Sequence, residues 1–328
     1  MTIASATVAV VGAGCAGLAA ARRLTDAGAQ VTIFERDAGA GGRMATQHFH
    51  ERSYDHGAQF FSVREPVFLS TISRLTTAGV AAVWPARWGH FYGAHLSQEQ
   101  HATPRFVGVG GMNRIVTALA EGIALIPDSE VTDLSRSQGQ WTIEIRGRDP
   151  VGGFDIVLLA VPAPEAASLL TGIAEFAIDI AAATYAPCWA VMAEFEIPLP
   201  IEFDAIRIDD SILAWAARNS SKPGFDSSTE TWVLHASPEW SLAYLEEPAE
   251  AVQDILLDRF RWVFRFDEVA RHATAHRWRH ALVQQSAGLP FFWDPGLQIG
   301  TCGDWCLGPR VEAAFDSGFA LAEALIRG

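Results

Sequence analysis

The sequence predicts an α/β fold: a Rossmann-like dinucleotide-binding domain joined to a second domain with a mixed, largely antiparallel β-sheet and helices. An apolar strand at Val8–Val11 runs into the glycine-rich turn Gly12–Gly17, and an alanine-rich helix and a second strand ending at Glu35 follow. That order of strand, G-x-G-x-x-G turn, helix, strand and acidic residue is typical of a dinucleotide-binding unit. Alternating apolar residues and many aromatics between about Gly172 and Pro295 predict the second domain.

Each part of the first unit has a physical role beside a phosphate-bearing ligand. Gly12 permits a tight turn, Gly14 lets the backbone approach a pyrophosphate, and Gly17 lets the helix pack on the strand. The N-terminus of the helix offers free N–H groups and about half a positive charge to phosphates. Glu35 is placed to accept hydrogen bonds from an adenosine ribose, and its charge would repel a 2′-phosphate. The unit therefore predicts a dinucleotide without a phosphate on that ribose.

Composition limits the classes to which the protein can belong. The 328 residues are 49% hydrophobic and 19% charged, which is enough for two globular domains with a large buried core. A formal net charge of −14 argues against nucleic acid or an anionic membrane as the main partner. The four cysteines are few and scattered, and no stretch reaches the length of a membrane span. We therefore expect a soluble, cytoplasmic protein.

Between the two units the pattern predicts elements in a regular order. A helix is expected at Val67–Thr77, and another follows the glycine-rich stretch Phe106–Arg114. Strand-like spacing on both sides of Ser137-Gln138-Gly139 predicts a hairpin. The continuous apolar run Phe154–Val161 suits a buried parallel strand.

The second domain is expected to contain four strands and one helix near Pro248–Trp262. The predicted strands are Trp189–Phe195, Ile206–Ala217, Trp232–Ser237 and His276–Val283. The chain then ends on a strand at Leu297–Gly300, the pair Gly303-Asp304 and a closing helix over Arg310–Ile326. We expect a discontinuous cofactor domain of residues 1–65, 106–170 and 296–328, and a substrate domain of residues 66–105 and 171–295.

Three glycine-rich segments, Gly12–Gly17 with Glu35, Gly41-Gly42-Arg43 and Gly303-Asp304, would make sense if one long ligand lay across all of them. Five stretches carry a further likeness: VGAGCAGLAAARRL, FERDAGAGGRMAT, DHGAQFFSVR, SKPG and GDWCLGPRVEAAFDSG. On these the chain resembles the two-dinucleotide-binding flavoproteins of the amine-oxidase type, and most closely the bacterial form of the renalase family. The first stretch is generic to that superfamily, whereas SKPG, GAQFF and the last stretch are more specific.

The resemblance implies FAD held noncovalently and oxidation of isomeric dihydronicotinamide dinucleotides, the 2- and 6-dihydro forms of NAD(P). Hydride would pass to flavin N5, and O2 would reoxidise the flavin and yield hydrogen peroxide. By the same resemblance Asp304 would bind the ribityl chain, and the N–H groups around Val311 and Glu312 would face the flavin pyrimidine. A helix N-terminus there would stabilise the negative charge of reduced flavin by about 0.3–2 kcal/mol. The alternatives are an amine or other small-molecule oxidase or dehydrogenase on the same scaffold, and a flavin-binding protein without turnover.

The site residues follow from these segments. No catalytic side chain is expected, because a dihydropyridine that loses hydride gains aromaticity and needs no general base. The candidates for substrate binding are Gln59, Phe60, Phe61, Arg64, Trp215, Lys222, Trp232, His235 and Trp278. The candidates for cofactor binding are Gly12, Ala13, Gly14, Cys15, Ala16, Gly17, Glu35, Arg36, Gly42, Arg43, Met44, Ala58, Gln59, Phe60, Val131, Gly303, Asp304, Arg310, Val311 and Glu312.

Other residues allow two interpretations. Lys222, the only lysine, lies in the turn-forming stretch Asn219–Gly224, which favours an exposed side chain or a substrate-phosphate contact over a role in catalysis. Arg64 and Arg105 could hold substrate phosphates or form interdomain ion pairs. The histidines at 272, 276 and 280 alternate around Trp278 as on a strand, and we expect no metal there.

Overall fold

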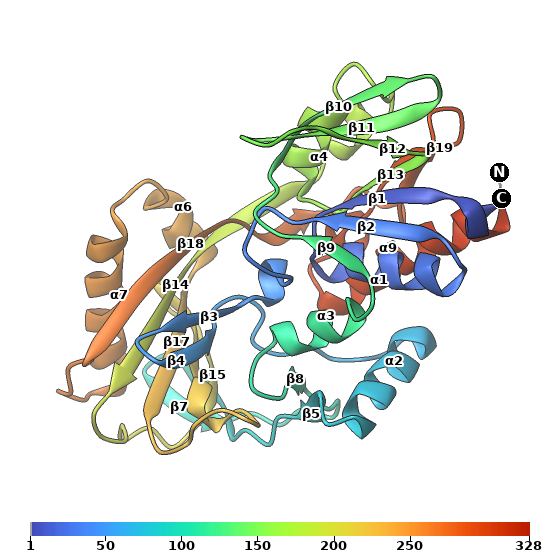
Figure 1. Ribbon diagram of the computed structural model, residues 1–328. Helices are drawn as coiled ribbons and strands as arrows, with labels where there is room; N and C mark the ends of the chain where they lie inside the picture. The colour runs from blue at the N-terminus through green and yellow to red at the C-terminus, as the bar shows by residue number, and fades with distance from the viewer. Residues whose placement is uncertain (1) are drawn as a thin grey trace.

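The computed structural model describes residues 2–328, and a six-stranded sheet holds together the first and last parts of the chain. Five strands run parallel and β19 pairs antiparallel at one edge (Figure 1). The strands lie in the order β19 (Phe292–Asp294), β20 (Ile299–Thr301), β13 (Ile156–Leu159), β1 (Thr7–Val11), β2 (Gln30–Phe34) and β9 (Ala124–Ile126). The central position of β1 and β13 follows from their continuous apolar sequence, because only a strand covered on both faces can bury every side chain.

Both faces of this sheet are covered. On one face lie α1 (Cys15–Asp26), α3 (Asn113–Leu119) and α9 (Val311–Arg327), which share one hydrophobic cluster with β1 and β2. On the other lies a three-stranded antiparallel sheet of β10 (Val131–Ser137), β11 (Gln140–Ile145) and β12 (Val151–Phe154). The predicted hairpin is therefore confirmed and gains a third strand.

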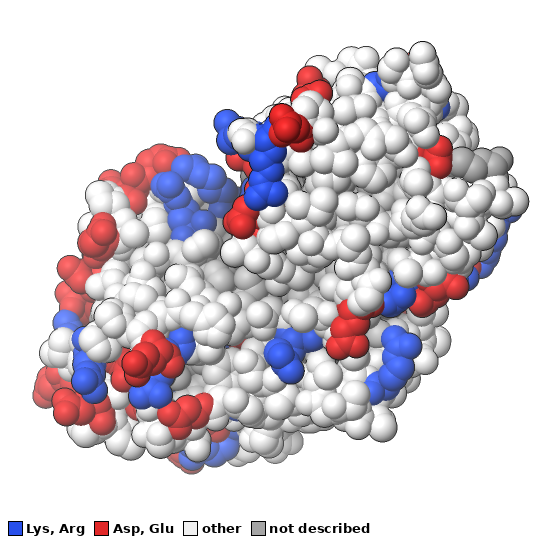
Figure 2. Space-filling view, in the orientation of Figure 1, with Lys and Arg blue, Asp and Glu red and all other residues white. Residues whose placement is uncertain are grey.

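A seven-stranded sheet forms the second part of the molecule. Its order is β18 (His272–Gln285), β14 (Thr184–Phe195), β17 (Glu230–Ala236), β16 (Leu213–Arg218), β15 (Ala205–Ile208), β6 (Trp88–Tyr92) and β7 (His95–Gln98). Every neighbouring pair is antiparallel except β15 with β6, which confirms the mixed, largely antiparallel sheet. The long helix α7 (Ala249–Phe264) covers one face. Figure 2 shows a hollow, lined mainly by uncharged residues in this view, between the two parts of the molecule.

The remaining elements are short and connect or brace the two sheets. They are α2 (Pro66–Thr77), α4 (Ala163–Leu170), α5 (Ala177–Ile180), α6 (Pro238–Ala243), α8 (Asp304–Leu307), the hairpin β3 (Thr46–Phe49) and β4 (Arg52–Asp55), the pair β5 (Ala81–Val83) and β8 (Phe106–Gly108), and 3-10 turns at Ile3–Ser5, Gly42–Met44 and Asn219–Ser221. Within residues 2–328 no helix is both long and apolar enough to cross a membrane.

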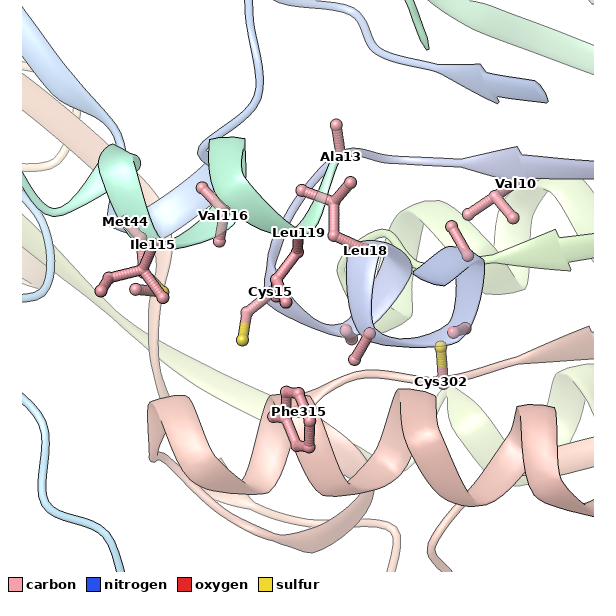
Figure 3. Packing of buried hydrophobic residues seen from close by; sticks show 14 of the residues in the cluster. Val10, Ala13, Cys15, Leu18, Met44, Ile115, Val116, Leu119, Cys302 and Phe315 are labelled. Carbon is pink, nitrogen blue, oxygen red and sulfur yellow. The ribbon is translucent and has the colours of Figure 1, made fainter. Parts of the chain in front are cut away.

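The first and last helices are in backbone contact. A Cβ added to Gly318 of α9 would lie 2.0 Å from the carbonyl oxygen of Ala16 in α1, so only glycine fits at this crossing. Phe315 of the same helix points toward Cys15 at the start of α1 (Figure 3). The helix that closes the chain is thereby fixed against the turn of the first dinucleotide-binding unit.

One predicted strand is wrong. The stretch Ile206–Ala217 forms two strands, β15 and β16, instead of one. Between them the Asp210 carboxylate accepts hydrogen bonds from the backbone N–H groups of Ile212 and Leu213, at 3.0 and 3.1 Å. Such aspartate-to-backbone bonds close turns, and the sequence Asp209-Asp210-Ser211 supplies the turn residues that the alternating apolar pattern concealed. The division of the chain into two domains stays a prediction.

Candidate functional site

Two glycines of the first turn are required by the fold itself. Gly12 has a φ of +101°, and a Cβ there would lie 2.7 Å from the carbonyl oxygen of Ala160. A Cβ at Gly17 would lie 2.1 Å from the carbonyl oxygen of Gly12. The tight turn and the close packing of α1 predicted from these positions are therefore present.

The fold does not require glycine at position 14. Its φ of −78° and ψ of −179° suit any residue, and a Cβ built there would meet no heavy atom within 4 Å. Neither backbone strain nor protein packing explains a glycine at this position. The open space lies at the N-terminus of α1, where backbone N–H groups and the helix dipole favour phosphate. This geometry fits a pyrophosphate that lies directly against the backbone.

Glu35 follows β2 and is buried, with 5% of its surface exposed. Its carboxylate accepts hydrogen bonds from the N–H of Ala13 at 2.6 Å and of Asp37 at 3.0 Å. Burial raises the pKa of Glu35, and these two backbone bonds act in the opposite direction. A carboxylate has about four acceptor positions, so capacity remains for the hydroxyl groups of a ribose.

The three glycine-rich segments meet, as one shared ligand requires. The N–H of Gly41 donates to the carbonyl oxygen of Ala13 at 3.1 Å, which joins the second segment to the first. The guanidinium of Arg43 donates to both oxygens of Asp304, at 2.7 and 2.6 Å, which joins the second segment to the third. Arg43, a predicted cofactor-binding residue, is thus paired with Asp304, another of these candidates.

The start of α9 completes this group of segments. The Sγ of Cys15 lies 3.7 Å from the carbonyl oxygen of Val311. The buried Glu312 carboxylate accepts hydrogen bonds from the backbone N–H groups of Arg64 and Glu65, at 2.6 and 2.9 Å. Glu312 thus fastens the first turn of α9 to the chain just before α2.

Replacing Asp316 with asparagine is expected to stabilise the protein at neutral and alkaline pH but not near pH 4. The pKa of Asp316 is raised from 3.8 to about 6, chiefly by burial and also by the Glu312 and Glu65 carboxylates, while Arg310 opposes the rise. Because the folded state disfavours the ionised form, Asp316 lowers stability progressively as pH rises from about 4 to 6, and by a constant amount above that range. Asp316→Asn should raise the free energy of unfolding by about 1–2 kcal/mol at pH 8, after allowance for solvent screening, and leave it unchanged near pH 4. Urea unfolding at both pH values tests this, with the exposed helical Asp254→Asn as the control.

Phe60 and Phe61, predicted together as substrate contacts, point to different surroundings. Phe60 is half-buried, its ring meets those of Trp88 and Trp215 with centroids 5.1 and 5.7 Å apart, and the Arg105 guanidinium lies 5.0 Å from its centroid. Phe61 is only 3% exposed and belongs to the core of the first part of the molecule. Phe60 therefore remains a candidate for substrate contact, whereas Phe61 does not.

A cluster of neutral aromatic side chains lies beside this segment. The His56 ring stacks on Trp278, with centroids 4.8 Å apart, and meets His276 edge-on at 4.6 Å. The ring nitrogens Nε2 of His235 and Nε1 of Trp278 each lie 3.1 Å from the carbonyl oxygen of His56. Burial lowers the pKa of His56 to about 3 and of His235 to about 4, so both are neutral at pH 7. His56 lies in the stretch DHGAQFFSVR, but it is not among the site residues predicted from the sequence.

Trp232 does not reach this region. It is fully buried on the face of β17 that packs against Phe260 of α7, with ring centroids 5.2 Å apart. Because side chains alternate along a strand, Val233 and His235 face the other way. The prediction of a substrate contact at Trp232 is therefore wrong.

Lys222 is not an exposed loop residue. Its side chain is completely buried, and its Nζ lies 3.1 Å from Asp55 and 3.2 Å from Gln59. The preference for an exposed lysine or one that contacts a substrate phosphate is therefore wrong. The turn-forming residues before it adopt a 3-10 turn, as their sequence indicates, but this turn is packed inside the molecule.

The other candidates have varied surroundings. Arg64 has an exposed side chain without an ion-pair partner among residues 2–328, and Arg105 stacks on Phe60 and contacts His101 instead of a carboxylate. Three of the cofactor candidates lie in different places. Arg36 forms an ion pair with Glu165 at the surface, and Met44 is buried in the core. Val131 is the first residue of β10. The histidines at 272, 276 and 280 lie on strand β18, and the part of the chain that the structure describes holds no group of three metal-ligating side chains.

Sequence comparison finds relatives for the first part of the chain. Residues 10–75 match the family described as an NAD(P)-binding Rossmann-like domain. Protoporphyrinogen oxidase 2, chloroplastic/mitochondrial, of Arabidopsis thaliana is 44% identical over 59 residues, a stretch that spans 18% of this chain and 12% of that protein.

Structural comparison finds likeness over the whole chain. A protein of Exiguobacterium sp. 255-15, provisionally assigned as a protoporphyrinogen oxidase, has a TM-score of 0.81 at 13% identity and covers 98% of this chain and 99% of its own. Putrescine oxidase solved with putrescine has a TM-score of 0.73 at 15% identity and covers 98% of this chain and 99% of its own. Cyclohexylamine oxidase from Brevibacterium oxydans IH-35A has a TM-score of 0.75 at 12% identity and covers 98% of this chain and 99% of its own. These likenesses confirm the amine-oxidase-like fold expected from the sequence.

Proposed function

We propose that this protein is an FAD-dependent oxidoreductase that binds FAD noncovalently. The observation that carries the proposal is the open position at Gly14, in the first of three segments from distant parts of the sequence that contact one another in turn. A ligand that reaches from Glu35 past Gly14 to Asp304 must be long and must carry a pyrophosphate near its middle. FAD has this form, and the oxidases with the same fold support the choice.

The chain's own residues would divide the binding of FAD between them. Glu35 would accept hydrogen bonds from the adenosine ribose, and the backbone around Gly14 would donate to the pyrophosphate. Asp304 would hold the ribityl chain, and the N–H groups at Val311 and Glu312 would face the pyrimidine. When bound, FAD supplies a two-electron acceptor that no side chain provides.

The proposed reaction is the oxidation of 2- or 6-dihydro-NAD(P), with O2 as the final acceptor and hydrogen peroxide as the product. The substrate side chains suit this reaction because the imidazoles near Trp278 are neutral and Phe60 offers an uncharged face. A dihydropyridine needs positioning and shelter from water, and it needs no base. The likeness of the sequence to the renalase family supports the choice of these dihydropyridine isomers as substrates.

Anaerobic mixing of the FAD-loaded protein with 6-dihydro-NAD tests this function. The flavin absorbance should be bleached within one turnover, 2-dihydro-NAD should be compared in parallel, and ordinary NADH serves as the control. Admission of O2 should then restore the absorbance and release one equivalent of peroxide. A flavin that stays oxidised with both isomers would count against the proposed substrate class.

The second candidate is oxidation of an amine or another small molecule, favoured by the putrescine oxidase and cyclohexylamine oxidase that share the fold. Bleaching by amines, without bleaching by either dihydro isomer, would select this candidate. A protein that binds FAD but is reduced by neither class would be consistent with a role without turnover. Steady peroxide production with any of these compounds would exclude that third possibility.

Replacing Arg64 is expected to weaken binding of dinucleotide substrates selectively. Arg64 follows the segment that carries Phe60, and its backbone N–H donates to Glu312 at the start of α9. Its side chain is exposed and has no ion-pair partner among residues 2–328. If Arg64 holds a substrate phosphate, Arg64→Ala should raise the half-saturating concentration of 6-dihydro-NAD about tenfold, which is ~1.4 kcal/mol. The isomeric dihydronicotinamide riboside, which lacks phosphate, should be unaffected. Arg74→Ala, at another exposed arginine nearby, is the control, and equal effects on both substrates would exclude the phosphate contact.

A further inference from the structure

The only lysine of the chain forms a buried ion pair between the two parts of the molecule. The side chains of Lys222 and Asp55 are both completely inaccessible to solvent, and their charged atoms lie 3.1 Å apart. The ammonium also donates to Gln59 Oε1 at 3.2 Å and lies 5.2 Å from the ring centroid of Trp84. Lys222 comes from the turn after β16, whereas Asp55 ends β4.

Both oxygens of the Asp55 carboxylate have hydrogen-bond partners. One oxygen accepts hydrogen bonds from the Thr46 hydroxyl and from the N–H of Met112, both at 2.8 Å, and the other accepts the lysine. Burying two charges costs several kcal/mol, and apolar residues of similar size often stabilise a protein at least as well. Stability alone therefore does not account for an ion pair here, and a role in fixing a particular arrangement is a reason to keep it.

The contact with Gln59 shows which arrangement is fixed. Because its Oε1 accepts from Lys222, the amide nitrogen of Gln59 must point the other way, and it donates to the carbonyl oxygens of Asp55 and Gly57. The ammonium thus determines the orientation of the amide, and the amide holds the backbone turn from Asp55 to Gln59 closed. Without Lys222, the present orientation of Gln59 would leave its buried Oε1 without a hydrogen-bond donor. In the flipped orientation, the same oxygen would face the carbonyl oxygens of Asp55 and Gly57 and be repelled by them.

This turn lies directly against the candidate cofactor site. The N–H of Ala58 donates to the carbonyl oxygen of Arg43 at 2.8 Å, and a Cβ at Gly57 would lie 2.2 Å from that same oxygen. Arg43 in turn holds Asp304. A shift of the turn therefore cannot be absorbed locally and would displace the second glycine-rich segment.

Neighbours of Lys222 reinforce its position. The side chain of Asn219 accepts from the N–H of Asp55 at 3.2 Å and donates to the carbonyl oxygen of Ser53 at 2.8 Å. The N–H of Gly110 donates to the carbonyl oxygen of Pro223 at 2.9 Å. The stretch Asn219–Gly224 thus packs into the first part of the molecule through polar contacts on both sides of the lysine.

We propose that Lys222 is a positioning residue. Through its contacts with Asp55 and Gln59, it holds the Gly57–Phe60 segment against Arg43. The position of this segment in turn determines where Phe60 lies relative to bound cofactor and substrate. The part that concerns cofactor and substrate rests on the proposed function. The part that concerns the segment does not, because it follows from the contacts of the protein alone.

The test compares Lys222→Met with the double variant Asp55→Asn/Lys222→Met in the full chain. Methionine keeps most of the length of the side chain and removes the charge. Asparagine in the double variant removes the carboxylate charge that Lys222→Met leaves unpaired. Three quantities are measured: the urea midpoint, hydrogen exchange at the backbone N–H groups of residues 56–61, and the rate of flavin reduction at saturating substrate. Arg271→Met, which removes one exposed positive charge without an ion-pair partner among residues 2–328, is the matched control.

Lys222→Met should lower the urea midpoint, and the double variant should regain at least half of that loss. In both variants, however, exchange of residues 56–61 should be at least tenfold faster and flavin reduction at least tenfold slower than in the parent. A double variant that recovers slow exchange and fast reduction along with the midpoint would show a purely structural ion pair and overturn the proposal. Unchanged exchange in Lys222→Met would overturn it equally. If no tested compound reduces the flavin, the proposed function fails, and the exchange measurement still decides the role of Lys222.

Discussion

Replacing Gly14 with valine is expected to abolish FAD binding in a protein that still folds. The φ of −78° accepts a β-branched residue, and the open surroundings of the Cβ mean that no protein atom must move. The isopropyl group would occupy the space where the pyrophosphate approaches the N–H groups at the start of α1. Steric exclusion and the loss of these hydrogen bonds should weaken FAD binding at least about a hundredfold, or roughly 3 kcal/mol.

The measurement is the flavin content of the purified variant and its affinity for added FAD. Gly39→Val is the matched control, because Gly39 lies in the neighbouring loop, is exposed, has no positive φ and also has an open Cβ direction. The control should retain its yellow colour, and the urea midpoints of both variants should match that of the parent. A Gly14→Val protein that keeps all of its FAD would show that the pyrophosphate lies elsewhere.

Replacing Gly318 with alanine is expected to destabilise the fold, although alanine favours helices. The gain in helix propensity is about 1 kcal/mol. Against it stands a Cβ placed 2.0 Å from the carbonyl oxygen of Ala16, a backbone atom that cannot turn aside as a side chain can. The two helices must separate, so the free energy of unfolding should fall by at least about 2 kcal/mol net.

Urea unfolding of the protein without FAD measures this change, and Gly39→Ala, whose Cβ meets nothing within 4 Å, should stay within ~0.5 kcal/mol of the parent. Separation of α1 from α9 also moves the start of α9 away from Cys15, so the affinity for FAD should fall as well. An alanine variant as stable as the parent would mean that the crossing of these helices can adjust.

The sequence predicted most of the first part of the fold because its signals are local. The unit from β1 to β2 follows from a run of apolar residues, a spaced set of glycines and a helical pattern, all within the first 35 positions. The meeting of Gly14, Arg43 and Asp304 could be predicted only through a hypothesis about a ligand long enough to join them.

Neither the burial of a side chain nor the face of the sheet on which it lies could be predicted in the same way. The stretch Asn219–Gly224 shows its turn in its residues, but Lys222 is buried because it meets Asp55, 167 positions earlier. Alternation places Trp232 and His235 on opposite faces of β17 without showing which face meets α7. An irregularity in the pairing between Leu213 and Trp215 further shifts the face on which Trp215 lies.

The contact of α9 with α1 also determines when the protein can become functional during its synthesis. The start of β1 and the end of α9 lie close together at one end of the molecule (Figure 1). Because α9 follows every other element of residues 2–328, the small-residue face of α1 has no partner on the ribosome until α9 has been made. A growing chain therefore exposes this apolar face until that point. Loading with cofactor must follow the synthesis of α9, and a messenger that stops before α9 would yield a protein unable to hold it.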